Sequence, residues 1–273
     1  MKSPFLALLG LAAMTTAASL GCAATAEVGD ESDETSEEAL TRRQLPGVVA
    51  VEIAEVRGQS TVLSSRTLGA PKKVQSVMST IHKLRPTEPV PRCLERDTAR
   101  LTFMDASGKK VATVGSYCGG FGSISFENGS PGYGVRFNAA AVDAAKDAPL
   151  AVGDFLWAIS KIEVSRPGTQ EKRTLTEGQL KPILGGFDLD EVPDAKASFP
   201  RCLPSHVVTF KRGNAEVAHT SFICGSTSAA TAPASVKAQF SGISPTSPDG
   251  DSLAHGAIKV DPRPVIKALE AKN

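Results

Sequence analysis

The four residues Pro-Arg-Cys-Leu stand at positions 91–94 of the chain and again at positions 200–203. Each copy leads into a strand-forming run that ends in Thr-Phe, and a second cysteine followed by glycine comes after it, at 118–119 and at 224–225. The two cysteines are 25 residues apart in the first copy and 22 apart in the second. This recurrence predicts two tandem copies of one small domain, each with a β-hairpin between its cysteines.

The five cysteines fit one disulfide in each copy. Setting Cys22 aside leaves four cysteines, which allow three pairings, and the repeat favours Cys93–Cys118 and Cys202–Cys224. On the chain-entropy model, closing loops of this length stabilises each domain by roughly 3 to 4 kcal/mol. A zinc site built from all four cysteines is the alternative, which the absence of any Cys-x2-Cys pair disfavours.

The residues around each hairpin follow one order. Alternating apolar and polar residues at 49–56 and 159–165 predict an opening strand, and a second strand ends in Arg-Thr-Leu at 66–68 and 173–175. A helical pattern, the hairpin, a further strand and a closing helix follow. Each copy therefore predicts an α+β fold, in which an antiparallel sheet carries helices packed on one face and holds one disulfide.

The helices show recognisable ends. The first begins at Pro71, and its apolar spacing continues to Leu84. In the second copy Thr176 and Gln179 form a capping-box pattern, while Pro182 predicts a short or kinked helix. These patterns predict helices of unequal length at corresponding places in the two copies.

The repeat sets the domain boundaries at 44–150 and 151–273. A closing helix ends each domain, capped by Asn138 in the first and by Asp261 in the second. Trp157, the single tryptophan of the chain, lies near the junction. We interpret it as a packing residue between the domains rather than as a platform for a ligand.

The copies differ mainly after the second cysteine, where the second copy carries a longer polar loop at 242–256. Such loops are often tolerated insertions, and they are also where binding function tends to lie. His206 and His219 fall on the two strands of the second hairpin, so they could approach each other across it. A metal site would need further ligands, so we interpret them as surface histidines and expect no metal and no cofactor.

The chain lacks the sequence motifs of common enzymes: it has no G-x-S-x-G, H-E-x-x-H, P-loop or Rossmann glycine pattern. We therefore expect a protein that is not an enzyme. A net charge of about +5 over residues 44–273 and an aromatic content of 5% exclude a nucleic-acid partner. Arg92 and Arg201 precede the first cysteine of each copy. They are candidate anion contacts, or structural residues that bind loop carbonyls or an acid.

Residues 1–21 have the features of an export signal. Lys2 is followed by an apolar core at 5–14 that is too short to span a bilayer. The stretch Ser-Leu-Gly-Cys, ending at Cys22, resembles the lipobox of bacterial lipoproteins, particularly the type with an acidic tether that is common in predatory soil bacteria. The resemblance implies a signal peptide, a lipid attached to Cys22 and a membrane anchor. The acidic run within 22–43 predicts a disordered tether.

Two features bear on where the protein resides. Ala23, which follows Cys22, is not the aspartate associated with retention at the inner membrane, and this favours the outer membrane. Cleavage near Ala26, at an Ala-x-Ala site, would instead give a soluble periplasmic or secreted protein. The expected partners are the membrane, through the lipid, and a protein of the cell envelope, with the oligomeric state left open.

The tandem, disulfide-bearing α+β arrangement is similar to that of the β-lactamase inhibitory proteins, which also duplicate a helix-on-sheet unit with a disulfide in each. The similarity implies an architecture and no function, because a fold does not determine an activity. We predict an envelope lipoprotein that binds a protein or a ligand. The alternatives are a structural or assembly component of the envelope, and a hydrolase whose site the sequence does not reveal.

Overall fold

The described part of the chain forms one compact unit. The computed structural model describes residues 39–40, 44–57, 61–85, 88, 97–118, 120–226, 228–243 and 252–271. All of them belong to the unit Glu37–Asn273. The predicted signal peptide, Cys22, most of the tether, Arg92 and Cys93 lie outside the described residues, and the side chain of Cys118 is not described. Lipid attachment and the disulfide Cys93–Cys118 therefore stay predictions.

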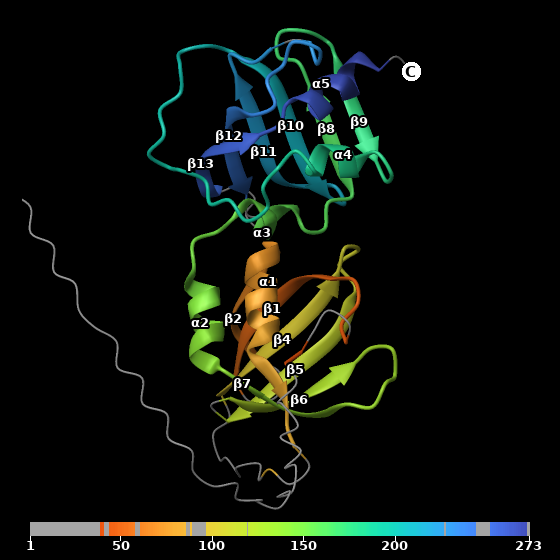
Figure 1. The fold of residues 1–273 in the computed structure, drawn as a ribbon, viewed down its shortest axis with the longest axis vertical. Helices are drawn as coiled ribbons and strands as arrows, with labels where there is room; N and C mark the ends of the chain where they lie inside the picture. Colours follow the sequence, from red (N-terminus) through yellow and green to blue (C-terminus); the bar gives the residue numbers. More distant parts are fainter. Residues whose placement is uncertain are drawn as a thin grey trace, which may run out of the picture. The chain divides into compact units, whose positions relative to one another are not determined.

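The first sheet contains seven of the described strands in the order β2-β1-β4-β5-β6-β7-β3 (Figure 1). All neighbouring strands are antiparallel. The strands are β1 Val48–Arg57, β2 Thr61–Leu68, β3 Ile81–Lys83, β4 Asp97–Asp105, β5 Lys110–Cys118, β6 Phe121–Phe126 and β7 Tyr133–Phe137. The helices α1 Pro71–Ser79 and α2 Ala139–Asp147 contact each other.

The second sheet contains six described strands in the order β13-β12-β11-β10-β8-β9, again all antiparallel. The strands are β8 Lys161–Ser165, β9 Lys172–Thr176, β10 Pro204–Arg212, β11 Ala215–Ile223, β12 Val236–Ile243 and β13 Ser252–Val260. Three short helices accompany them: α3 Val152–Leu156, α4 Leu180–Leu184 and α5 Arg263–Glu270.

Six strands follow the same order in both sheets. The order β2-β1-β4-β5-β6-β7 in the first corresponds to β9-β8-β10-β11-β12-β13 in the second, and β3 extends the first sheet alone. A helix follows the second strand of each set, and another follows the last strand. The predicted α+β class with antiparallel sheets is confirmed, and the shared order is the one that a duplicated domain would give.

Each sheet has its own hydrophobic core, made by the apolar residues that alternate along its strands. Phe103 packs with Met78 of α1 in the first core, and both are fully buried. In the second, Phe240 meets Phe155 of α3 edge to face, with 5.8 Å between ring centroids. Burying one such side chain contributes about 1.5 to 3 kcal/mol, so the helices are held mainly by these apolar faces.

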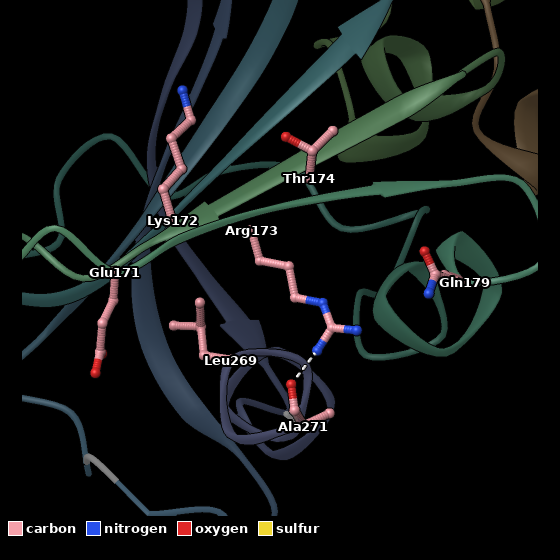
Figure 2. A pocket seen from close by; sticks show the side chains of 7 residues that line it. All are labelled: Glu171, Lys172, Arg173, Thr174, Gln179, Leu269 and Ala271. Atoms are coloured by element: carbon pink, nitrogen blue, oxygen red, sulfur yellow. Dashed lines mark hydrogen bonds between the residues drawn. The ribbon is translucent and has the colours of Figure 1, made fainter. Parts of the chain in front are cut away.

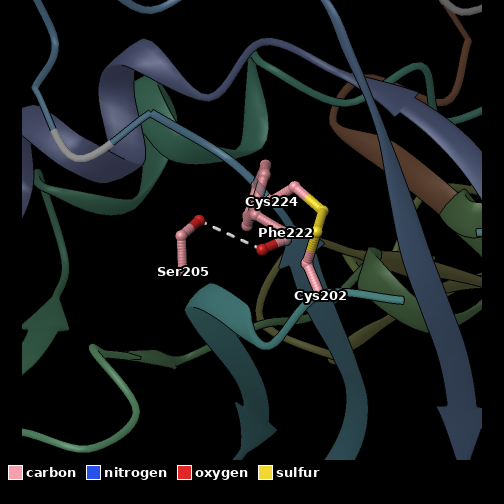
Figure 3. The surroundings of a disulfide bond; sticks show 4 residues. All are labelled: Cys202, Ser205, Phe222 and Cys224. Carbon is pink, nitrogen blue, oxygen red and sulfur yellow. Dashed lines mark hydrogen bonds between the residues drawn. A yellow bond between two sulfur atoms is a disulfide. The ribbon is translucent and has the colours of Figure 1, made fainter. Parts of the chain in front are cut away.

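The predicted disulfide Cys202–Cys224 is confirmed. It joins the residues just outside β10 and β11, with the Cα atoms 5.4 Å apart (Figure 3). It closes a separation of 22 residues, which corresponds to about 3 kcal/mol on the chain-entropy model. Beside it, the Ser205 hydroxyl donates to the carbonyl oxygen of Phe222 at 3.0 Å. A structural disulfide indicates an oxidising, exported compartment.

Two predicted boundaries in the first half are wrong. Helix α1 ends at Ser79 rather than near Leu84, because Ile81 begins β3 and pairs with β7. Leu40, which the sequence assigned to the tether, is 3% exposed, and its N–H donates to the carbonyl of Ile81 at 2.7 Å. The folded part therefore begins before residue 44, because the apolar pair Ala39-Leu40 has a sheet edge and a core to bury against.

The predicted caps have mixed outcomes. Asn138 accepts a hydrogen bond from the backbone N–H of Ala141 at 3.1 Å, as expected for the cap of α2. Gln179 is the N-cap residue of α4 and makes no side-chain cap, so the predicted capping box with Thr176 is wrong. Asp261 stands one residue before the N-cap of α5 and accepts from the N–H of Arg263 at 3.0 Å.

The predicted loop at 242–256 is also shorter than expected. Gly242 lies in β12 and Gly256 lies in β13, so both ends of the predicted loop belong to strands. A Cβ atom on Gly256 would lie 2.5 Å from the carbonyl carbon of Asp194. The glycine that suggested a loop is therefore a strand residue that a neighbouring backbone segment approaches closely.

Asp154 of α3 holds the junction between the two sheets. Its carboxylate, with 1% of the side chain exposed, accepts the N–H groups of Gly69, Ala70 and Ala151 at 2.9, 3.0 and 2.9 Å. The ammonium group of Lys73 in α1 completes the set at 2.6 Å. A buried carboxylate needs such partners, because an unpaired buried charge is costly.

Trp157 packs between the halves, as the sequence analysis expected. A Cβ on Gly69 would lie 2.6 Å from the Cβ of Trp157, so only glycine fits this approach. On its other side, the guanidinium of Arg212 lies 4.2 Å from the centroid of the indole. Arg212 also donates to the carbonyl of Phe155 at 3.1 Å. The junction is thus built from residues of both halves.

Candidate binding groove

An elongated hollow of about 860 Å³, called here the α4–α5 groove, lies between α4, α5 and β9. Apolar residues contribute more than half of its lining: Leu175, Pro182, Ile183, Ala229, Ala230, Pro264, Ala268 and Ala271. A second hollow of about 510 Å³, the edge hollow, shares Arg173, Gln179 and Ala271 with the groove (Figure 2). Both hollows meet at the arginine of the Arg-Thr-Leu stretch in β9.

The length of α4 leaves room for the groove. Helix α4 has five residues, whereas α1, its counterpart in the first half, has nine. Pro182 lies inside α4, and the N–H of Gly185 closes the helix on the carbonyl of Lys181 at 2.9 Å. Because α4 covers less of its sheet, the surface of α5 that faces it stays open.

Helix α5 supplies the opposite wall. Val265 and Ile266 are each 1% exposed, and Val265 belongs to the second core. Pro264, Lys267 and Ala268 line the groove instead, at the helical spacing that places them on a neighbouring face. Ala268 is half-buried and also packs against the second core, so this face of α5 forms the border between the core and the groove.

The segment between β11 and β12 supplies a further wall through Ala229 and Ala230. In the first half two glycines connect the corresponding strands β5 and β6, whereas this connection runs from 224 to 235. The N–H of Ala229 donates to a carboxylate oxygen of Glu270 at 3.1 Å, which attaches the segment to α5. This wall has no counterpart of similar length in the first half.

Arg173 joins β9 to the end of α5. Its Nη1 donates to the carbonyl oxygens of Ala268 and Ala271 at 2.7 and 2.5 Å, and Figure 2 shows the second of these contacts. Carbonyl groups at a helix C-terminus lack partners within the helix, and a basic side chain can satisfy them. Among the described residues no acceptor binds its Nε or Nη2, so these donors are available at the two hollows.

Charges around the two hollows are unevenly paired. Asp261 binds Arg263 at 2.6 Å, and this contact is the main reason that the pKa of Asp261 lies below its usual value. Glu171 binds Arg166 at 2.9 Å. Within the described part of the chain, no carboxylate pairs with Arg173 or Lys267. The lining therefore carries two cations that lack an acidic partner.

The two histidines of the second hairpin do not form a pair. His206 lies opposite Phe222, whereas His219 lies opposite Thr209, so the two side chains point to opposite faces of the sheet. His219 binds Glu216 at 3.0 Å. The suggestion that they approach each other across the hairpin is wrong. His219 pairs with Thr209, which is three residues from His206 along β10, and side chains an odd number of residues apart on a strand point to opposite faces.

His206 is not a surface residue. It is 1% exposed, and its Nδ1 lies 3.2 Å from the hydroxyl of Ser205, which already donates to Phe222. Nδ1 therefore carries the hydrogen, and Nε2 is buried with no hydrogen-bond partner among the residues that the structure describes. Burial is the main cause that lowers the pKa of His206, and the charge of Arg166 adds to it.

Arg201, one of the two predicted anion contacts, does not line the groove. Arg201 is exposed and, within the described residues, makes no hydrogen bond or ion pair. Arg92 lies outside them. The cations that the structure brings together are Arg173 and Lys267, which the sequence analysis missed as a site. The repeated Arg-Thr-Leu stretch could have pointed to Arg173, but we used it only to mark the end of a strand.

The remaining observations concern known classes of site and protein. The described residues contain no cluster of three histidine, cysteine or acidic side chains placed to hold a metal. None of the described helices has the length and apolar character needed to cross a membrane. Comparison of the chain with models of protein families, with curated proteins and with solved structures finds no match.

Proposed function

We propose that the protein is a lipoprotein of the cell envelope that binds a ligand in the α4–α5 groove. The observation that carries the proposal is the groove itself, an open hollow of about 860 Å³ with an apolar lining and few polar groups. Binding sites for small molecules commonly measure about 300 to 1,000 Å³ and have this kind of lining.

The comparison of the two halves supports the proposal. We interpret them as copies of one duplicated domain, on the basis of the repeated sequence and the shared strand order. Copies of a domain keep the scaffold and diverge where they bind. The short α4 and the long segment 224–235 are both changes of the second half, and both line the groove.

The expected location agrees with a binding module. The disulfide Cys202–Cys224 fits an exported protein. In the proposed arrangement a lipid on Cys22 anchors the chain, at the outer membrane, and the acidic tether lets the folded part reach a ligand or an envelope partner. The protein acts without catalysis.

The test is the binding of Nile red, a neutral apolar dye, to the purified chain with its disulfides intact. We expect saturable binding of one dye per chain. The substitution Ala268→Trp places an indole in the groove and should weaken binding at least tenfold. Ala145→Trp is the matched control, because Ala145 is the half-buried residue at the corresponding place in α2 of the first half.

The outcomes separate clearly. Binding that Ala268→Trp abolishes and Ala145→Trp preserves supports the groove as the site. Absence of saturable binding, or an equal loss in both variants, contradicts it. Circular dichroism of each variant establishes that it folds before the comparison is made.

A further inference from the structure

The chemistry of the groove lining indicates what kind of ligand would fill it. None of the described residues that line the groove is aromatic, and the apolar surface that stays accessible comes from aliphatic side chains such as those of Pro182, Pro264 and Ala268. A surface of this kind buries methylene groups well and offers no ring for stacking. It therefore suits an alkyl chain better than a planar ring system.

The charges at the groove indicate the head group. Both acidic side chains that line the two hollows already have a basic partner, Asp261 with Arg263 and Glu171 with Arg166. Lys267 and Arg173 have no acidic partner among the described residues. An incoming anion would thus meet two cations without displacing an existing ion pair.

Arg173 is also held in place before any ligand arrives. Its Nη1 binds two carbonyl oxygens at the end of α5, at 2.7 and 2.5 Å, which fixes the plane of the guanidinium. Nε and Nη2 remain as donors on the same plane. An arginine that presents two fixed donors matches a carboxylate, which has two oxygens in a plane.

Building on the proposed function, we propose that the α4–α5 groove binds a single-chain alkyl carboxylate, that is, a free fatty acid. The alkyl chain lies along the aliphatic lining between α4 and α5. The carboxylate is bound by the free donors of Arg173 and by the ammonium group of Lys267. No bond is made or broken.

The counterpart in the first half lacks the same donors. Arg66 donates through Nη1 to the carbonyl of Lys146 and through Nη2 to that of Ala148, the latter at 2.5 Å. Its Nε is buried without a partner. Its two terminal nitrogens are both used by the helix end, so the anion site is a property of the second half.

The experiment measures displacement of Nile red by three ligands with the same chain: dodecanoate, dodecanol and dodecyltrimethylammonium. We expect dodecanoate to bind about tenfold more tightly than the other two. Each methylene removed from the carboxylate should weaken binding about fourfold, until the chain no longer fills the groove.

Lys267→Gln tests the head group without removing the cap of α5. We expect it to reduce the preference for dodecanoate over dodecanol from about tenfold to about twofold. Lys146→Gln is the matched control, because Lys146 is the basic residue in the last turn of the corresponding helix α2. This control should keep the full preference.

The results distinguish the two proposals. If Nile red binds the groove but dodecanoate and dodecanol compete equally, the carboxylate site is wrong and the binding groove stands. If Lys267→Gln keeps the tenfold preference, the assigned head-group contact is wrong. If Nile red does not bind, both proposals fail together.

Discussion

Arg66 and Arg173 occupy corresponding positions in the two halves, yet their surroundings differ. Both lie on the second strand of their half, and both bind carbonyl groups at the end of the closing helix. Arg66 uses both terminal nitrogens and has a buried Nε. Arg173 uses one nitrogen and borders two hollows. The same contact with the end of the closing helix thus leaves one donor pattern at Arg66 and another, beside an open groove, at Arg173.

The difference arises from elements around the arginine. A nine-residue α1 in the first half corresponds to a five-residue α4, and a two-glycine connection corresponds to the segment 224–235. Shortening one element uncovers α5, and lengthening another adds a wall beside it. The groove is therefore present in the second half while the arginine contact and the order of six strands are the same in both halves.

The largest expected effect on stability comes from a substitution at the junction between the two halves. Asp154→Ala removes the acidic partner of Lys73 and the acceptor of three N–H groups, so we expect it to lower the free energy of unfolding by about 3 to 5 kcal/mol. Chemical denaturation followed by fluorescence and by circular dichroism checks this. Glu171→Ala removes an exposed ion pair and should cost less than 1 kcal/mol. Equal losses in the two variants would show that the junction depends on other contacts.

The next prediction concerns the two arginines directly. Arg66→Met should lower the free energy of unfolding by about 1 to 3 kcal/mol, because it leaves partly buried helix carbonyls without donors. Arg173→Met should cost less than about 1 kcal/mol, because water in the hollows can reach the carbonyl of Ala271. Parallel urea titrations measure both. A larger loss for Arg173→Met would contradict the idea that this end of α5 is open.

The smallest expected effect is the pH dependence of stability that His206 contributes in the second half. Its pKa lies below the usual value of 6.5, so the unfolded chain binds a proton more readily than the folded chain does. The contribution to stability is complete above about pH 6.5 and is lost as the pH falls below it. His206→Leu should therefore flatten the decline in stability between about pH 7.5 and pH 5.5.

His219→Gln is the control for this experiment, since His219 lies on the outer face and binds Glu216. This variant removes a histidine but keeps the buried ring of His206, so a flattening seen only in His206→Leu belongs to the buried ring. The first half has Ala99 near the place of His206. If both histidine variants flatten the profile equally, the burial of His206 is not the cause.

Local patterns in the sequence predicted much of the fold. The hairpin strands, the class of fold and the pairing of Cys202 with Cys224 follow from alternation, turn residues and the repeat, all of which act over short distances. The predictions failed where a distant segment changed the meaning of a residue. Gly256 was predicted to end a loop, but it lies in strand β13. It is a glycine because the backbone at Asp194 lies too close for a Cβ atom.

The sequence by itself was enough to predict antiparallel hairpins, an α+β class and the pairing of Cys202 with Cys224, because these depend on residues that are near one another or that repeat. Only the tertiary structure decided that β9, α5 and the segment carrying Ala229 come together around Arg173. These elements are far apart in the chain, and no local pattern encodes the space between them. The groove exists because of how the elements pack, and its unpaired cations can be identified only after every acidic neighbour has been placed.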